Sequence, residues 1–225
     1  MPRIFRILPE NGFLHILTRG NNRQIVFHDN NDYESYINLI KNYKHENKVK
    51  ICHYCLMPNH IHLIVEISTE SNLPRFMKQL NLAYLHYYKK KYKYDGHLWQ
   101  GRYKSLIISK DEYLIACAKY IELNPLKAKI VNNPKEYKYS SYSVYAYGKE
   151  DEIVEYDPIY LDWGKTDKER QLYYRKYLNE KMKTISLNLN ARFIGADDFI
   201  KQMENDFKVV NLNGKRGRPR TTKNK

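Results

Sequence analysis

The order of predicted elements along this chain indicates an α+β fold, in which helices pack against an antiparallel sheet. Residues 13–18, 50–67 and 102–108 have the apolar runs and alternation of strands. Residues 32–45, 73–92 and 109–125 instead carry apolar side chains at helical spacing. The resulting order is strand, helix, two strands, helix, strand, helix.

The first strand, FLHILT at residues 13–18, leads into the polar and basic sequence RGNNRQ. We predict a turn there, and its cationic and amide side chains are of the kind that contact nucleic-acid phosphates. The candidates are Arg19, Asn21, Asn22 and Arg23. The helix predicted at 32–45 follows, with its apolar face toward the sheet.

Residues 50–67, KICHYCLMPNHIHLIVEI, are predicted to form a β-hairpin with Pro58 and Asn59 at the centre of its turn. Alternate side chains of a strand share a face, so His60 and His62 point the same way. Two imidazoles ~6.6 Å apart along a strand can converge on one metal ion. The alternative is an ordinary core histidine beside an unrelated one.

A zinc site is a competing interpretation, because Cys52 and Cys55 precede the histidines. In an extended segment, however, these two cysteines face opposite sides of the sheet and cannot share one tetrahedral site. With the turn at Pro58 and Asn59, Cys55 lies across from His62 and would be at most a fourth ligand.

Two further segments carry candidate DNA contacts. The helix at 73–92 has a basic flank that includes Arg75 and Lys78, which is either a phosphate-binding surface or an ordinary solvated face. The loop at 96–101 contains Trp99, which suits either base stacking or the core. Arg102 and Lys104 at the start of the next strand extend this basic region.

The segment 109–125, SKDEYLIACAKYIELNP, is predicted to be a helix. Ser109 and Glu112 have the spacing of a capping box, and Pro125 is expected to stop the helix. Tyr120 and Asn124 then lie one turn apart on one side. Taken alone, the pattern favours an ordinary amphipathic helix with a tyrosine at the edge of its packed face.

We predict three regions along the chain: a main domain at 1–150, a small helical appendage at 156–208 and a disordered basic tail at 209–225. Thr166 and Glu169 have the spacing of a capping box within the appendage. The tail contains Arg216-Gly217-Arg218-Pro219, which is similar to an AT-hook that binds the minor groove of A·T-rich duplex DNA. Non-specific phosphate binding by the tail is the alternative.

The composition favours a polyanionic partner. The formal net charge is +14 and the pI is near 9.4, which indicates nucleic acid, with an anionic membrane surface as a weaker alternative. There is no apolar run long enough for a membrane helix, and three cysteines fit a reducing compartment. We therefore expect a cytoplasmic, nucleoid-associated protein. Tyrosine occurs 22 times, so a catalytic tyrosine must be selected by geometry.

The segments LTRGNNRQIVFHD, YCLMPNHIHLIVE, GHLWQGRYKS and YIELNPLKAKIV, in this order, resemble the single-tyrosine HUH transposases and most closely the REP-associated tyrosine transposases. The resemblance covers residues 1–148 and implies a ferredoxin-like core. It places the family's metal-binding histidines on His60 and His62, its nucleophile on Tyr120 and its third metal ligand on Asn124.

The resemblance implies a metal-dependent enzyme that cleaves and rejoins single-stranded DNA at hairpin-forming sequences through a 5′-phosphotyrosine. The three ligands are neutral, so the site would keep the full charge of the ion for substrate phosphate. The expected ion is Mg²⁺ or Mn²⁺, of which Mn²⁺ tolerates imidazole better. Whether the protein acts as a monomer or a homodimer is left open. The alternatives are a non-catalytic regulator that binds DNA or RNA hairpins on the same fold, and a zinc hydrolase that uses Cys55, His60 and His62.

Overall fold

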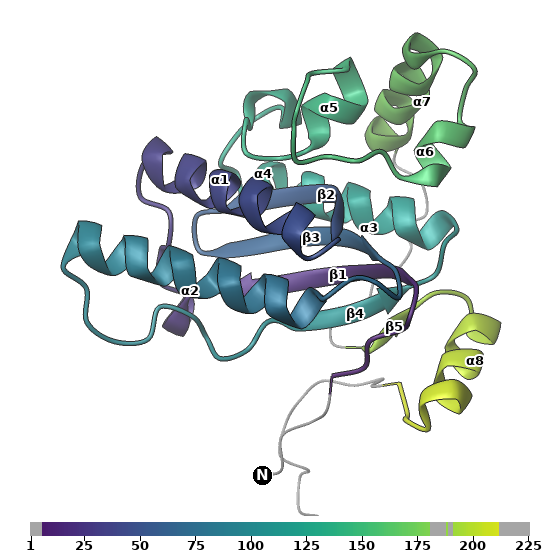
Figure 1. Ribbon diagram of the computed structural model, residues 1–225. Helices are drawn as coiled ribbons and strands as arrows, with labels where there is room; N and C mark the ends of the chain where they lie inside the picture. Colours follow the sequence, from purple (N-terminus) through teal and green to yellow (C-terminus); the bar gives the residue numbers. More distant parts are fainter. Residues whose placement is uncertain (1–5, 181–187, 189–190, 212–225) are drawn as a thin grey trace, which may run out of the picture.

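A five-stranded sheet forms the centre of the protein (Figure 1). The computed structural model describes residues 6–180, 188 and 191–211. The strands lie in the order β2-β3-β1-β4-β5. Their bounds are Gly12–Arg19 for β1, Lys50–Met57 for β2, His60–Ile67 for β3, Lys104–Ile108 for β4 and Phe193–Ile194 for β5.

Strands β1 to β4 pair antiparallel with one another, in the ferredoxin-like order predicted. The hairpin of β2 and β3 turns at Pro58 and Asn59, as expected. Two details differ from the prediction. The strand expected from Arg102 begins at Lys104, and the two-residue strand β5 pairs parallel to β4, so the sheet is mixed.

Helices α1 (Asn30–Glu46) and α2 (Leu73–Tyr92) lie on one face of the sheet (Figure 1). The N-terminus of α1 is closed by a capping box, in which Asp29 accepts from the backbone N–H of Asp32 and the Asp32 carboxylate accepts in return. Both helices bury a stripe of large side chains. These include Tyr36, Ile40, Phe76, Leu80 and Tyr84.

Helix α3 (Glu112–Glu122) lies on the opposite face, and the short helix α4 (Asn124–Lys127) follows it. The predicted capping box is wrong: Asp111 is the N-cap and accepts from the backbone N–H of Tyr113. Ser109 instead continues the sheet, because its N–H donates to the Ile194 carbonyl. The predicted stop at Pro125 also differs, because α3 ends three residues earlier and Pro125 lies in the first turn of α4.

The C-terminal part of the chain, from residue 142 onward, contains α5 (Tyr142–Tyr147), α6 (Pro158–Asp162), α7 (Asp167–Asn179) and α8 (Asp197–Phe207). The capping box of Thr166 and Glu169 is present at α7, as predicted. Tyr160 of α6 and Tyr174 of α7 belong to the same buried cluster as the sheet. The AT-hook-like tail with Arg216 and Arg218 lies outside the described residues, and the predicted division into domains stays a prediction.

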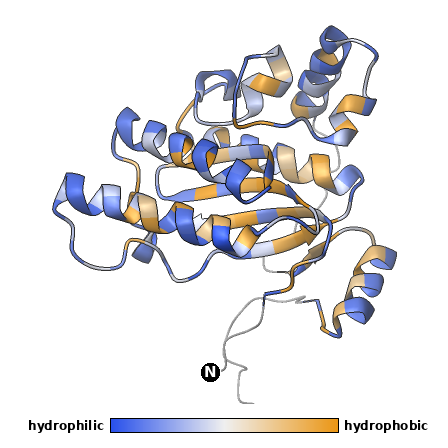
Figure 2. Ribbon diagram, viewed as in Figure 1, coloured by the Kyte–Doolittle hydropathy of each residue, from blue (hydrophilic) through white to orange (hydrophobic). Residues whose placement is uncertain are grey.

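Apolar side chains concentrate along the strands and the inner sides of the helices (Figure 2). Two short 3₁₀ turns, Asn21–Arg23 and Pro134–Glu136, complete the regular structure. None of the helices in the described part of the chain is both long and apolar enough to cross a membrane. The sheet therefore separates a face covered by α1 and α2 from a face covered by α3, and the second face carries the candidate site.

Candidate active site

The two histidines of the hairpin lie at the start of β3, on the face covered by α3. His60 pairs with Arg19 and His62 with Leu17 across the β1–β3 ladder. The two imidazole centroids are 4.9 Å apart and the rings are nearly perpendicular. The period of two in an extended strand therefore brings both rings together, as the sequence predicts.

Tyr120 extends from the last turn of α3 toward this pair. Its ring centroid lies 6.0 Å from that of His62, with an interplanar angle of 88°. Asn124 begins α4 four residues later, and its side-chain Nδ2 is buried without a hydrogen-bond partner. The structure thus brings Tyr120 and both histidines together and leaves the Asn124 amide nitrogen uncommitted.

Both rings are held through their Nδ1 atoms. The Nδ1 of His60 lies 2.6 Å from Oδ1 of Asn59, whose Nδ2 donates to the Arg23 carbonyl. The Nδ1 of His62 lies 2.7 Å from Nε2 of His15. The sequence reasoning missed His15, although the alternation of β1 placed it on the face that Leu17 shares. The contact of His15 with His62 depends on the register of β1 against β3, which the sequence pattern alone does not give.

The histidines lie in an environment that disfavours the imidazolium form. Burial, followed by the charge of Arg19, lowers the pKa of His60 to about 4. Burial lowers the pKa of His62 well below its usual value, and His15, His60 and Arg19 add to this effect. Both side chains are therefore neutral at pH 7, which is the form that coordinates a metal.

The Tyr120 phenol is protonated at neutral pH. Burial raises its pKa above the ordinary value, the nearby Cys117 adds to this, and the positive charge of Arg19 opposes it. The Lys127 ammonium lies 4.8 Å from the centre of the Tyr120 ring. Lys119, the neighbour of Tyr120 in sequence, instead donates to the carbonyls of Tyr177 and Glu180. Two cationic side chains, Arg19 and Lys127, therefore lie near the Tyr120 ring.

The zinc interpretation is wrong for the described residues, among which no three His, Cys, Asp or Glu side chains are grouped as a metal site. Cys55 does pair with His62 across the hairpin, as expected, but it is completely buried, and burial raises the pKa of its thiol well above the usual value. Cys52 lies at an irregularity of the β2–β3 register.

The predicted basic turn after β1 lies beside the histidines. Asn21, Asn22 and Arg23 are exposed, and the backbone of this turn is fixed to the hairpin by the N–H of Gly20, which donates to the Asn59 carbonyl. A Cβ atom on Gly20 would collide with the carbonyl oxygen of Gln24, so glycine is required at this close approach. The turn therefore presents its polar side chains next to His60.

The other candidate DNA contacts are more scattered. Lys104 is exposed and lies opposite Leu17, on the face that carries His62. Arg102 is exposed just before β4. Arg75 forms an ion pair with Glu46 in the first turn of α2, at the end of the sheet away from His60. Lys78 is exposed one turn further along the same helix.

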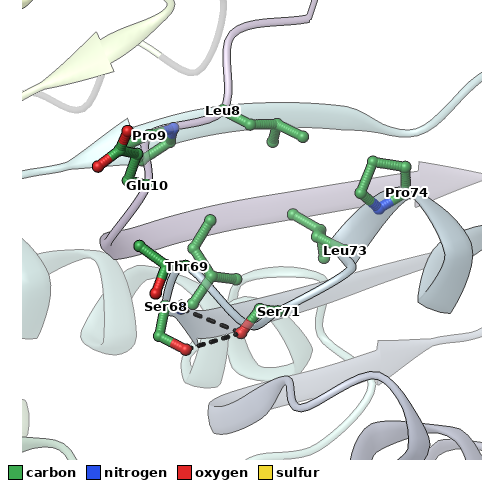
Figure 3. A pocket seen from close by; sticks show the side chains of 9 residues that line it. Leu8, Pro9, Glu10, Ser68, Thr69, Ser71, Leu73 and Pro74 are labelled. Carbon is green, nitrogen blue, oxygen red and sulfur yellow. Dashed lines mark hydrogen bonds between the residues drawn. The ribbon is translucent and has the colours of Figure 1, made fainter.

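Trp99 is half-buried and packs against the core. Its indole N–H donates to the Asn81 carbonyl, and its ring contacts Tyr36 and Tyr84. This placement favours the second of the two roles that the sequence left open. A shallow pocket between Leu8, Glu10 and Ser71 lies where β3 ends, at the opposite end of that strand from His60 (Figure 3). It is therefore separate from the histidine site.

A ferredoxin-like sheet with a histidine pair facing a tyrosine on a helix defines the class of single-tyrosine transposases. Comparison with known proteins agrees. The sequence model described as "Transposase IS200 like" matches residues 10–124, which are 115 of the 225 residues. The chain belongs to this IS200-like transposase family.

Two individual proteins similar to this chain carry names more specific than that of the family. The chain is 29% identical over 98 residues to a Haemophilus influenzae protein named "Putative REP-associated tyrosine transposase". That match spans 39% of this chain and 56% of the relative, little more than half of the relative's length. A solved REP-associated tyrosine transposase bound to a REP hairpin has the same fold, with a TM-score of 0.56, 17% identity, and coverage of 70% of this chain and 93% of that one.

Proposed function

We propose that this protein is a metal-dependent transposase that cleaves and rejoins single-stranded DNA through Tyr120. The observation that carries the proposal is the contact of the Tyr120 ring with His62, 6.0 Å between centroids, beside His60. Membership of the IS200-like transposase family supports it.

The residues fit a divalent cation. The Nδ1 atoms of His60 and His62 are engaged, which leaves the Nε2 atoms for coordination. The buried Nδ2 of Asn124 has no partner, so the amide is not held by another group through its nitrogen. All three ligands are neutral, and Mg²⁺ or Mn²⁺ is the expected ion. When bound, the ion would neutralise charge on the phosphoryl oxygens of the DNA.

The reaction proposed for Tyr120 is an in-line displacement at phosphorus. The phenolic oxygen forms a bond to the phosphorus while the bond to the 3′ oxygen breaks, which leaves a 5′-phosphotyrosine and a free 3′-hydroxyl. The phenolic proton must leave, and its loss is opposed by the burial that raises the pKa of Tyr120. We assign the compensating positive charge to Arg19 and Lys127, which lie near the phenol.

We further propose that the DNA strand reaches the site along the turn after β1. Its exposed side chains, Asn21, Asn22 and Arg23, lie beside the hairpin turn that precedes His60. Amide and guanidinium groups bind phosphate oxygens and would fix the register of the strand. The substrate is proposed to be hairpin-forming single-stranded DNA, as the solved relative is bound to a REP hairpin.

A covalent-adduct assay tests this proposal. Parent protein and the Tyr120→Phe variant are incubated with hairpin oligonucleotides from the sequence flanking the gene and separated on a denaturing gel. We expect an adduct with the parent in Mg²⁺, none in EDTA and none with Tyr120→Phe. Tyr113→Phe, two turns earlier on the same helix, is the matched control and should retain the adduct. Hairpin binding without any adduct would instead identify a non-catalytic regulator.

A further inference from the structure

A third histidine, His15, lies behind the proposed metal site. It is in the middle of β1, it is completely buried, and its Nε2 is 2.7 Å from Nδ1 of His62. The two rings are 5.0 Å apart and within 16° of parallel. The Nδ1 of His15 is buried and has no hydrogen-bond partner. His15 therefore contacts its surroundings through a single polar interaction, the one with His62.

The proton of His60 is fixed by its neighbours. The Asn59 amide donates through Nδ2 to the Arg23 carbonyl, so its oxygen faces His60. An amide oxygen can only accept, and Nδ1 of His60 must therefore carry the proton. The lone pair of His60 is consequently on Nε2, ready for coordination.

The proton of His62 is not fixed in this way, because its partner is another imidazole. A neutral imidazole has one donor and one acceptor nitrogen, so two arrangements satisfy the same 2.7 Å contact. In the first, Nε2 of His15 donates to His62, and the proton of His62 is on Nε2. In the second, Nδ1 of His62 donates to His15, and the lone pair of His62 is on Nε2.

Only the second arrangement lets His62 coordinate a cation through Nε2. It requires the proton of His15 to be on Nδ1, where the buried N–H finds no acceptor. In the first arrangement, Nδ1 of His15 carries a lone pair without a donor instead of an N–H without an acceptor. A buried donor without a partner is unfavourable, so the protein without a cation prefers the first arrangement and the bound ion favours the second.

We propose that His15 is a positioning residue that accepts a hydrogen bond from the Nδ1–H of His62 and, through its own tautomer, determines whether His62 can bind the divalent cation. Each ring keeps one proton in both arrangements, so no net proton is gained or lost. This inference rests on the proposed function, because it assigns a role toward the proposed cation. It predicts that cation binding is coupled to the tautomer of a residue that never touches the ion.

Two measurements test the inference without relying on catalysis. Imidazole ¹⁵N chemical shifts identify the protonated nitrogen of each histidine. In protein without a cation we expect His15 and His62 both protonated on Nε2, and with saturating Mg²⁺ both protonated on Nδ1. If His62 binds Mg²⁺ while His15 keeps its proton on Nε2, the proposed coupling is wrong.

The second measurement is the affinity for Mn²⁺ alone, followed by electron paramagnetic resonance of the free ion. His15→Phe keeps the ring volume but removes the acceptor, and we expect affinity to fall about 10- to 100-fold. His15→Gln places an amide oxygen near the former Nε2 and should recover most of this loss. Thermal melting of each variant shows whether it is folded, and the chemical-shift test on the parent needs no variant.

The outcomes separate the two proposals. If the parent binds Mn²⁺ and forms the DNA adduct while His15→Phe binds Mn²⁺ as tightly, the inference about His15 falls and the proposed function stands. If the parent binds no Mn²⁺, both the metal assignment and the role of His15 fall. Loss of affinity in His15→Phe with recovery in His15→Gln supports the inference.

Discussion

His53 and the pair His60 and His62 lie on the same face of the sheet but have different hydrogen-bond partners. His53 on β2 contacts two carboxylates, Glu122 at 3.0 Å through Nδ1 and Asp157 at 2.9 Å through Nε2. His60 and His62 on β3 meet only an amide and another imidazole. Both groups lie under α3, yet the first has both ring nitrogens paired and the second leaves one nitrogen of each ring for a ligand.

The pKa values follow from these partners. Burial alone would lower the pKa of His53, but its hydrogen bonds to Asp157 and Glu122 outweigh burial and raise it to about 9. His15 and His60 meet no such carboxylate, and burial lowers the pKa of each to about 4. His53 is therefore a charged structural link between β2, the end of α3 and the start of α6, whereas His15 and His60 are neutral at pH 7.

The hydrogen-bond network of His53 also includes the end of α3, the helix that carries Tyr120. Glu122, two residues after Tyr120, accepts from His53, from the Ser141 hydroxyl and from the Tyr174 hydroxyl of α7. All of these groups are buried. The end of α3 is thus fixed by hydrogen bonds to His53 of β2, Ser141 and Tyr174 of α7. These bonds hold Tyr120 against β3. His53 therefore has a structural role, and His60 and His62 are the histidines proposed to bind the cation.

The largest expected effect comes from breaking the structural group. Glu122→Ala leaves the charged His53 with one carboxylate and the hydroxyls without an acceptor, and it should reduce the free energy of unfolding by about 3 to 5 kcal/mol. Urea denaturation measures this loss. Glu112→Ala, an exposed position at the start of the same helix, is the control and should change stability by no more than about 1 kcal/mol. An equal loss of unfolding free energy in both variants would show that the buried Glu122 network contributes no more to stability than an exposed residue of α3.

A smaller effect is expected from His62→Gln in the other group. This change removes one proposed ligand at nearly constant volume, and we expect adduct formation to fall about 100-fold, equivalent to about 2.7 kcal/mol. Single-turnover cleavage in Mg²⁺ provides the rate. The urea midpoint should change much less than in Glu122→Ala, and a variant that cleaves at the parental rate would show that His62 is not part of the site.

The two groups also predict opposite pH dependences of stability. The pKa of His53 is raised, so its contribution is complete below about pH 6.5 and is lost as the pH rises through about 9. The lowered pKa values of His15 and His60 predict the reverse, a loss of stability as the pH falls from about 6.5 toward 4. Urea midpoints across this range should form a maximum, and His53→Gln should flatten the alkaline side only.

The smallest effect concerns the tail, which belongs to neither group. Deleting residues 214–225 removes six cationic side chains. We expect weaker binding to duplex DNA, most of all to A·T-rich duplex, and a shallower dependence of affinity on salt concentration, by about 0.9 per lost phosphate contact. Cleavage of hairpin oligonucleotides at saturating concentration should not change. An unaltered salt slope would show that the tail does not contact DNA.

Much of the fold could be predicted because its signals are local. The hairpin turn at Pro58 and Asn59, the common face of His60 and His62, and the helix at 73–92 each follow from a short periodic segment. The capping of α3 was predicted wrongly because Asp111, a stronger local acceptor, competes with Ser109. Strand β5 was missed because two residues are too few to show alternation.

Contacts between residues far apart in the chain could not be predicted from one sequence. His15 reaches His62 only through the register of β1 with β3, 47 residues apart in the chain. His53 meets Asp157 over a separation of 104 residues. Local patterns indicated which residues carry the chemistry, but the partners that hold each ring come from distant segments.

The most direct test of the proposed site is to identify the tyrosine that becomes linked to DNA. Trypsin cleavage after Lys119 and Lys127 yields the peptide YIELNPLK, in which Tyr120 is the single tyrosine. Mass spectrometry of the adduct formed with hairpin DNA in Mg²⁺ should find the nucleotide phosphate on this peptide and no adduct in EDTA. A phosphate on any other of the 22 tyrosines, or an adduct of equal yield in EDTA, would contradict the assignment of Tyr120 beside a cation held by His60 and His62.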